Sequence, residues 1–240
     1  SIKQWRIGYI DKLNLQQGLR HRIAFPIIED SHEQKTIAMA YRKLDDNDEG
    51  PKYRNDANSI IYNKSEVLYG LNFAKKAIQA LDQVIVVEGY IDTIMAHQAG
   101  FTNTVGLGGT AFTEQQMQRL HKLTRNIVLW YDGDKSGQDA MHKSAVKLLK
   151  MGFDVFVIYP QMTLDPADII NQLAGKIDNY IKDNMAPYLR YLIMQECSSY
   201  RNFIHDKQIE IKKKIVPIIL QIDDPILQDH YMNYLLKELS

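Results

Sequence analysis

The sequence is poor in the residues that most often build cross-links and metal clusters. Its single cysteine, Cys197, excludes an internal disulfide and a cysteine-based zinc cluster. The seven histidines show no ligand spacing such as H-E-x-x-H. We therefore expect no zinc in this chain, and a reducing, cytoplasmic environment for it.

Long apolar runs and an excess of either charge are also absent. No apolar stretch approaches the ~18 residues of a membrane span, and SIKQWRIGYI lacks the apolar core of a signal peptide. Lys plus Arg and Asp plus Glu both number 29, so the formal net charge is zero. Binding to nucleic acid would then depend on local positive charge, with weak affinity and a shallow salt dependence. No membrane interaction is expected.

Two common catalytic signatures are missing as well. The chain has neither G-x-x-x-x-G-K-[ST] nor G-x-S-x-G, which argues against a P-loop ATPase and a serine hydrolase. The glycine-rich stretch GLGGT at 106–110 is better interpreted as a tight turn than as a phosphate cradle. The 240 residues, 45% of them hydrophobic, are enough for one large globular domain or two small ones.

Between Val84 and Ile170 short β-branched runs alternate with helical patterns. The pattern predicts strands at 83–89, 102–109, 126–132 and 154–160, with helices at 90–100, 113–123 and 135–152. Thr113 and Gln116 match a capping box at the start of the second helix. This alternation predicts an α/β fold, a doubly wound parallel sheet with helices on both faces.

The flanking segments have different patterns. Strands are predicted at 21–28 and 34–44, and the Asp-, Asn- and Gly-rich stretch at 44–59 is predicted to be a loop. After Gly175 the apolar spacing is helical, with breaks expected at Pro187 and Pro217 and a solvated helix face at 212–214. We predict a β-rich subdomain at 1–78, the α/β domain at 79–175 and a helical subdomain at 176–240.

Acidic residues follow three of the predicted strands. They are Glu88 after the first strand, Asp132 and Asp134 after the third, and Asp165 and Asp168 after the fourth; we call these five residues the acid edge. Carboxyl ends of parallel strands meet at one edge of a sheet, with neighbouring strands about 5 Å apart. Carboxylates gathered there would hold hard cations such as Mg²⁺. The alternative for each acid alone is a helix cap.

Four stretches of this region, VVEGYIDTIMAHQAG, VGLGGTAFTEQQ, VLWYDGDKSGQDA and LDPADII, occur in a distinctive order. In order and spacing they resemble the TOPRIM domain of DnaG-type bacterial and phage primases. Upstream, RIAFPI, PKYRN and NKSEVLYGLN are similar to further motifs of the same catalytic core. The resemblance covers nearly the whole chain.

The resemblance implies roles for individual residues. Glu88 would lie nearest the chemistry, Asp132 and Asp134 would be catalytic metal ligands, and Asp165 and Asp168 would complete a site for two or more Mg²⁺ or Mn²⁺ ions. Many family members have D-P-D where this chain has D-P-A-D. The residues expected to face nucleotide and template are Arg42, Lys52, Tyr53, Asn55 and Lys64; those expected to support the acids are Gly89, Asp92, Gly133 and Lys135.

The implied function is the synthesis of short RNA primers from NTPs on single-stranded DNA, with an RNA–DNA hybrid as product. A replicative helicase and a zinc-binding module would act through regions absent from this chain. Two alternatives remain open. A TOPRIM-type nuclease would use the same acids but has no use for PKYRN and NKSEVLYGLN, and a non-catalytic scaffold would bind metal or DNA without turnover.

Overall fold

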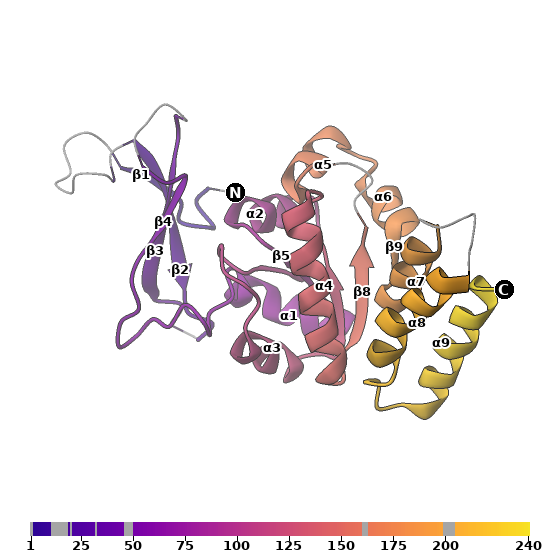
Figure 1. The fold of residues 1–240 in the computed structure, drawn as a ribbon. Coiled ribbons are helices and arrows are strands. Elements are labelled where there is room, and N and C mark those ends of the chain that lie inside the picture. The colour runs from indigo at the N-terminus through magenta and orange to yellow at the C-terminus, as the bar shows by residue number, and fades with distance from the viewer. Residues whose placement is uncertain are drawn as a thin grey trace.

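The computed structural model describes residues 2–10, 19, 21–31, 33–45, 50–159, 163–198 and 205–240. Parts of the predicted elements fall outside these ranges, namely 32 and 46–49 in the N-terminal turn and loop, 160 in the last predicted strand, and 199–204 in the C-terminal helical region. Figure 1 shows three parts in a row: an antiparallel sheet, a central α/β layer and a group of C-terminal helices.

The central sheet has the order β6-β5-β7-β8-β9. Its parallel strands are β5 (Val84–Val87), β6 (Thr104–Gly106), β7 (Asn126–Leu129) and β8 (Asp154–Ile158), which confirms the four predicted strands. A fifth strand, β9 (Met185–Pro187), pairs antiparallel with β8 and was not predicted. The chain order reverses beside β5, the arrangement that places a ligand site at the carboxyl ends of the strands.

Helices cover both faces of this sheet, as predicted. One face carries α1 (Leu71–Leu81), α3 (Glu114–His121) and α4 (Lys135–Lys150), and the other carries α2 (Tyr90–Gln98), α5 (Pro166–Gln172) and α6 (Ile177–Asn184). Successive residues of β5 alternate between the two cores because strand side chains point to opposite faces. The capping box of α3 is confirmed, since the backbone N–H of Gln116 donates to Thr113 Oγ1 at 3.1 Å.

The N-terminal sheet consists of β1 (Gly8–Ile10), β2 (Arg22–Ile28), β3 (Thr36–Lys43) and β4 (Tyr53–Asn55), all antiparallel. The strands predicted at 21–28 and 34–44 are confirmed. The loop prediction is wrong at 53–55, because these residues pair along the free edge of β3. The inner face of the sheet packs on α2 through an aromatic cluster that includes Trp5, Phe25, Tyr69 and Tyr90.

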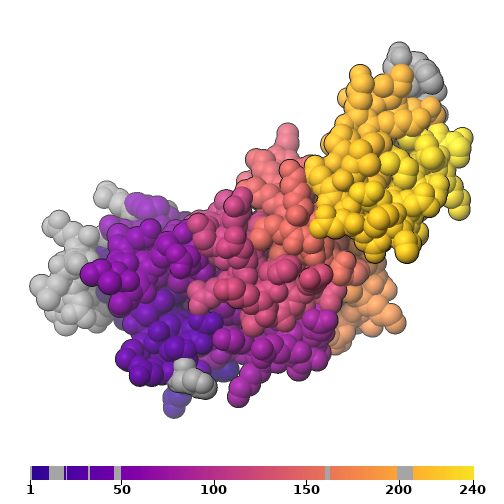
Figure 2. Space-filling view, turned by 90° about the horizontal axis from the view of Figure 1, so that it is seen from below, coloured from indigo at the N-terminus to yellow at the C-terminus, as the bar shows by residue number. Residues whose placement is uncertain are grey.

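The C-terminal helices are α7 (Tyr188–Ser198), α8 (His205–Ile219) and α9 (Pro225–Glu238). Figure 2 shows the last two at one end of an elongated molecule. Pro187 ends β9, but the break expected at Pro217 is wrong, because this residue lies inside the last turn of α8. Buried Ile215 and Ile219 hold that turn against the core. Lysines 212–214 are exposed, as predicted.

None of the helices in the described part of the chain is long and apolar enough to cross a membrane.

Candidate active site

The sheet brings Glu88 and Asp132 together at the ends of neighbouring strands. β5 and β7 are adjacent and parallel, and the N–H of Trp130 donates to the carbonyl of Val86 at 2.9 Å. Burial raises the pKa of Glu88 to about 7, and the Asp132 carboxylate adds to the effect. Burial, with Asp165 and Asp134 nearby, raises the pKa of Asp132 to about 6. The two carboxylates therefore share a partly desolvated site in which negative charge is unfavourable.

One oxygen of each of these carboxylates lacks a partner. Glu88 Oε1 and Asp132 Oδ1 are buried, and neither forms a hydrogen bond with the described residues. A buried carboxylate oxygen without a partner is costly, and a hard cation would satisfy it. In the described ranges, however, no three acidic, histidine or cysteine side chains lie close enough together to hold one ion.

Two members of the acid edge are turned toward helix N-termini. Asp134 Oδ1 accepts a hydrogen bond from the N–H of Gly137 at 2.7 Å and caps α4. Asp165 Oδ1 accepts one from the N–H of Asp168 at 2.7 Å and caps α5. In this structure both side chains therefore act as helix caps, which is the alternative considered for each acid alone. Asp168 and Lys135 are exposed in the first turns of these helices.

Asp92 fixes the backbone around Glu88. Its side chain is buried, with Oδ2 accepting from the N–H of Gly89 at 3.0 Å and Oδ1 from the N–H of Ala167 at 3.2 Å. A Cβ on Gly89 would lie 2.4 Å from Asp92 Oδ2, so any larger residue there would displace this carboxylate. Asp92 thus joins the start of α2 to the start of α5, on which Asp168 lies.

Gly133 links the turn after β7 to the segment that follows β8. Its N–H donates to the carbonyl of Leu164 at 3.0 Å, and its own carbonyl accepts from Gln138 Nε2 at 2.9 Å. The segment before Asp165 is therefore tied to the turn that contains Asp132. This link explains why Asp165 raises the pKa of Asp132 although the two residues follow different strands.

Basic and polar residues of the N-terminal sheet face the acids. Arg42 lies in β3 opposite Tyr53 of β4, with its guanidinium carbon 5.9 Å from the tyrosine ring centroid. Burial raises the pKa of Tyr53. Arg42 lowers this pKa, and three nearby acids, Asp92, Asp165 and Asp132, raise it further. Lys52 lowers the pKa of Asp132. Lys52 and Tyr53 therefore lie close enough to the acids to interact with them electrostatically, and Arg42 lies beside Tyr53.

Asn55 and Lys64 occupy a different position. Asn55 Oδ1 accepts a hydrogen bond from the Tyr90 hydroxyl at 2.7 Å. Lys64 is half-buried and lines a small cavity with Tyr90 and Gly108. No described contact joins Lys64 to the acids, so the structure places it beside the 106–110 turn instead. That segment is a tight turn, with positive φ at Gly108 and Gly109 and a Thr110 hydroxyl bonded to the Leu107 carbonyl at 2.9 Å.

Comparison with known proteins decides the family. The chain matches the family model described as "DNA primase catalytic core, N-terminal domain" over residues 2–75, and the model described as "Toprim-like" over residues 85–170. It is 37% identical over 180 residues to the DNA primase of Helicobacter pylori, covering 75% of this chain and 31% of that protein. The chain belongs to the family of DnaG-type DNA primases.

Solved primase structures share the fold. The DnaG primase catalytic domain bound to ssDNA superimposes with a TM-score of 0.83 at 22% identity, covering 99% of this chain and 84% of that one. The RNA polymerase domain of Mycobacterium tuberculosis primase, in complex with a double-stranded DNA oligomer with a 6-nucleotide overhang, gives a TM-score of 0.77 at 25% identity. That match covers 100% of this chain and 76% of that chain. The chain spans about a third of the length of the curated primases it matches.

Three residues that position parts of the candidate site were missed in the sequence. The guanidinium of Arg22, in the R-I-x-F-P-I motif, is buried and donates to the carbonyl of Pro51 at 3.0 Å, which holds the segment before Lys52. Tyr90 links α2 to β4. Gly137 packs directly on the backbone of Asp132. Motif membership was the available signal for all three, but it did not reveal these contacts.

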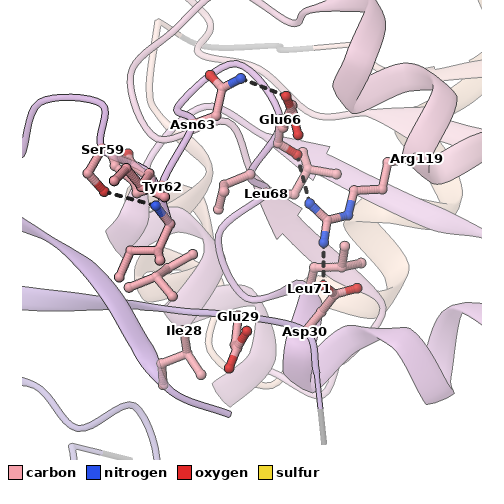
Figure 3. Close-up of a pocket in the computed structure, with 14 residues that line it drawn as sticks. Ile28, Glu29, Asp30, Ser59, Tyr62, Asn63, Glu66, Leu68, Leu71 and Arg119 are labelled. Carbon is pink, nitrogen blue, oxygen red and sulfur yellow. Dashed lines mark hydrogen bonds and ion pairs between the residues drawn. The ribbon is translucent and has the colours of Figure 1, made fainter. Parts of the chain in front are cut away.

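A further cavity of the primase fold, of about 470 Å³, lies between the N-terminal sheet and α3 (Figure 3). Arg119 crosses it, with one guanidinium nitrogen bonded to Asp30 and the other donating to the carbonyl of Glu66 at 3.1 Å. None of the lining residues belongs to the acid edge. We interpret this arginine as a connection between the two domains.

Proposed function

We propose that this chain links NTPs into short RNA primers on a single-stranded DNA template. The observation that carries the proposal is the pair of half-buried carboxylates, Glu88 and Asp132, each with one buried oxygen that has no hydrogen-bond partner among the described residues, beside Lys52 and Tyr53. Support comes from relatives named DNA primase and from a structural neighbour described as bound to ssDNA. A hydrolase built on the same acids would not need the facing basic sheet.

We infer that the acid edge holds two or more Mg²⁺ or Mn²⁺ ions. Glu88 and Asp132 fit this purpose because their free oxygens need a cation. Asp134 and Asp165 would join them by rotating away from their helix caps, and Asp168 would complete the set from the first turn of α5. Bound cations would lower the pKa of an attacking hydroxyl and offset the charge of the leaving group.

In the proposed step, the 3′-oxygen of one nucleotide attacks the α-phosphorus of an incoming NTP. A new P–O bond forms, the bond from the α-phosphorus to the oxygen bridging to the β-phosphate breaks, and pyrophosphate leaves. Glu88 accepts the hydroxyl proton as a general base. Arg42 and Lys52, with Tyr53 beside them, hold the triphosphate, and Lys64 and Asn55, beside the 106–110 turn, contact the template backbone.

The wider setting is also part of the proposal. We infer that the RNA–DNA hybrid is the product, that the reaction takes place in the cytoplasm during replication, and that a helicase and a zinc-binding module act through regions outside this chain. The zero net charge implies weak template affinity with a shallow salt dependence.

The test is a product analysis on a denaturing gel. The protein is incubated with single-stranded DNA, labelled NTPs and Mg²⁺ or Mn²⁺, beside Asp132→Asn as an isosteric control. Short RNA products that disappear in the variant support primer synthesis. Shortened DNA without RNA would establish a nuclease, and DNA binding without either product would establish a scaffold.

A further inference from the structure

A cavity of about 400 Å³ lies on the α4 side of Glu88, between that helix and the loop after β6. Its volume is in the range of small-molecule sites, which is about 300–1,000 Å³. Its floor is apolar and consists of the buried side chains of Leu107, Phe112 and Tyr131. A flat ring such as a nucleobase, with its ribose, is the kind of group that an apolar and aromatic floor accommodates.

The rim of the cavity is polar and differs in charge from one end to the other. Glu88 lies near the N-terminal end of α4, beside Tyr131, whose pKa is raised by burial and, to a smaller extent, by Glu88. Lys143 and Lys147 line the rim further along the helix, one turn apart and both exposed. The remaining rim residues are Thr110, Ala111, Ser136, Asp139, Ala140 and Ser144.

The spacing along α4 suits one nucleoside triphosphate. Lys143 follows Ser136 by seven residues, roughly 10 Å at 1.5 Å per residue. This separation is comparable with the distance from the 3′-hydroxyl to the terminal phosphate of an extended NTP. A nucleotide placed on the apolar floor could thus direct its hydroxyl to Glu88 and its phosphates to the two lysines.

The first bond of a primer requires two nucleotides. One presents its α-phosphate, and the other supplies the 3′-hydroxyl without the help of an annealed strand. The cations assigned to the attacked NTP, Arg42 and Lys52, face the acids from the N-terminal sheet, whereas Lys143 and Lys147 belong to a cavity on α4. Glu88 borders that cavity and is part of the acid edge.

We propose that the cavity beside α4 is the subsite for the initiating nucleoside triphosphate, the one that supplies the first 3′-hydroxyl. This inference rests on the proposed function. An annealed RNA primer is held by its base pairs, so its extension depends much less on the cavity than the joining of two free NTPs does. Initiation and extension therefore separate the inference from the function itself.

The experiment compares these two reactions in the full chain. Variants are the double change Lys143→Ala with Lys147→Ala, and Ala140→Leu, which fills the half-buried rim without altering charge. Lys150→Ala is the matched control, because Lys150 is exposed on the same helix but does not line the cavity. Thermal unfolding checks that each variant is folded.

For the double lysine variant we expect the KM of the initiating NTP to rise about tenfold, because a tenfold change corresponds to the loss of roughly one charge-assisted contact. Ala140→Leu should lower the rate of dinucleotide formation by a similar factor. In both cavity variants, extension of an annealed RNA primer should fall by less than about threefold. Lys150→Ala should behave as wild type in both reactions. An unchanged initiating KM, or an equal loss in both reactions, would overturn the assignment. Wild-type protein that cannot extend the annealed primer would instead refute the proposed function.

Discussion

Gly137 offers a sharp test of how the fold positions the acids. It lies in the first turn of α4, where general helix propensity would favour alanine by about 1 kcal/mol. Here, however, a Cβ would lie 2.3 Å from the carbonyl oxygen of Asp132 and 3.0 Å from its Cβ. The nearest atom is backbone, so no side-chain rotation can relieve the contact. Gly137→Ala should therefore move Asp132 rather than stabilise the helix.

The magnitude follows from the distances. Reaching ordinary carbon–oxygen contact from 2.3 Å requires a shift of about 1 Å. Overpacking of this kind costs about 1–3 kcal/mol, which exceeds the propensity gain, so the free energy of unfolding should fall by up to about 2 kcal/mol. A catalytic group displaced by about 1 Å can lose about 100-fold in rate.

The assay is dinucleotide synthesis together with urea unfolding. Gly8→Ala is the control, because a Cβ there would meet no atom of the described residues within 4 Å. We expect Gly137→Ala to lose activity by a much larger factor than its loss of stability can explain, while Gly8→Ala stays at the wild-type rate. A Gly137→Ala protein that is both more stable and fully active would show that this contact does not position Asp132.

Three further predictions concern the carboxylates and the domain contacts. The folded-state pKa of Glu88, about 7, lies above its ordinary value of about 4.3. In metal-free buffer the contribution of Glu88 to stability therefore falls as pH rises between these two values. Glu88→Gln should unfold at a higher temperature than wild type above pH 7 and at the same temperature below pH 4. In urea unfolding, Arg119→Ala should lower the free energy of unfolding more than Asp30→Asn does, because it also removes the hydrogen bond to the Glu66 carbonyl. The coupling energy between Arg119 and Asp30 should stay below about 1 kcal/mol, since the pair is partly exposed. Equal losses in the two variants would contradict the Arg119–Glu66 hydrogen bond. Tyr90→Phe should lower the free energy of unfolding by about 1 kcal/mol through loss of the Asn55 bond, and an unchanged value would argue against it.

Much of the fold follows from local patterns in the sequence. Alternating β-branched strands and helical runs fixed the four parallel strands, and the Thr113 capping box marked the start of α3 correctly. Because parallel strands have their carboxyl ends at one edge of a sheet, Glu88 and Asp132 could be predicted to converge if their strands were neighbours, and β5 and β7 are neighbours.

Contacts between distant segments were not predictable in the same way. β9 is only three residues long, and it is a strand because β8 offers it an edge. Pro217 stays helical because tertiary packing outweighs its local preference. The side chain of Asp134 is oriented by its hydrogen bond with the N–H of Gly137. An aspartate at this position could equally cap the helix or bind a metal, so the sequence alone does not predict this orientation.

The most direct test of the central claim is the rate at which Glu88→Gln and wild type join two NTPs on single-stranded DNA in Mg²⁺. Labelled dinucleotide and released pyrophosphate are measured together, so that bond formation is distinguished from hydrolysis. We expect equimolar products from wild type and a rate at least about 100-fold lower for the variant, because loss of a proton acceptor costs about 10²–10⁴. A folded Glu88→Gln protein that makes dinucleotide at the wild-type rate would contradict the account.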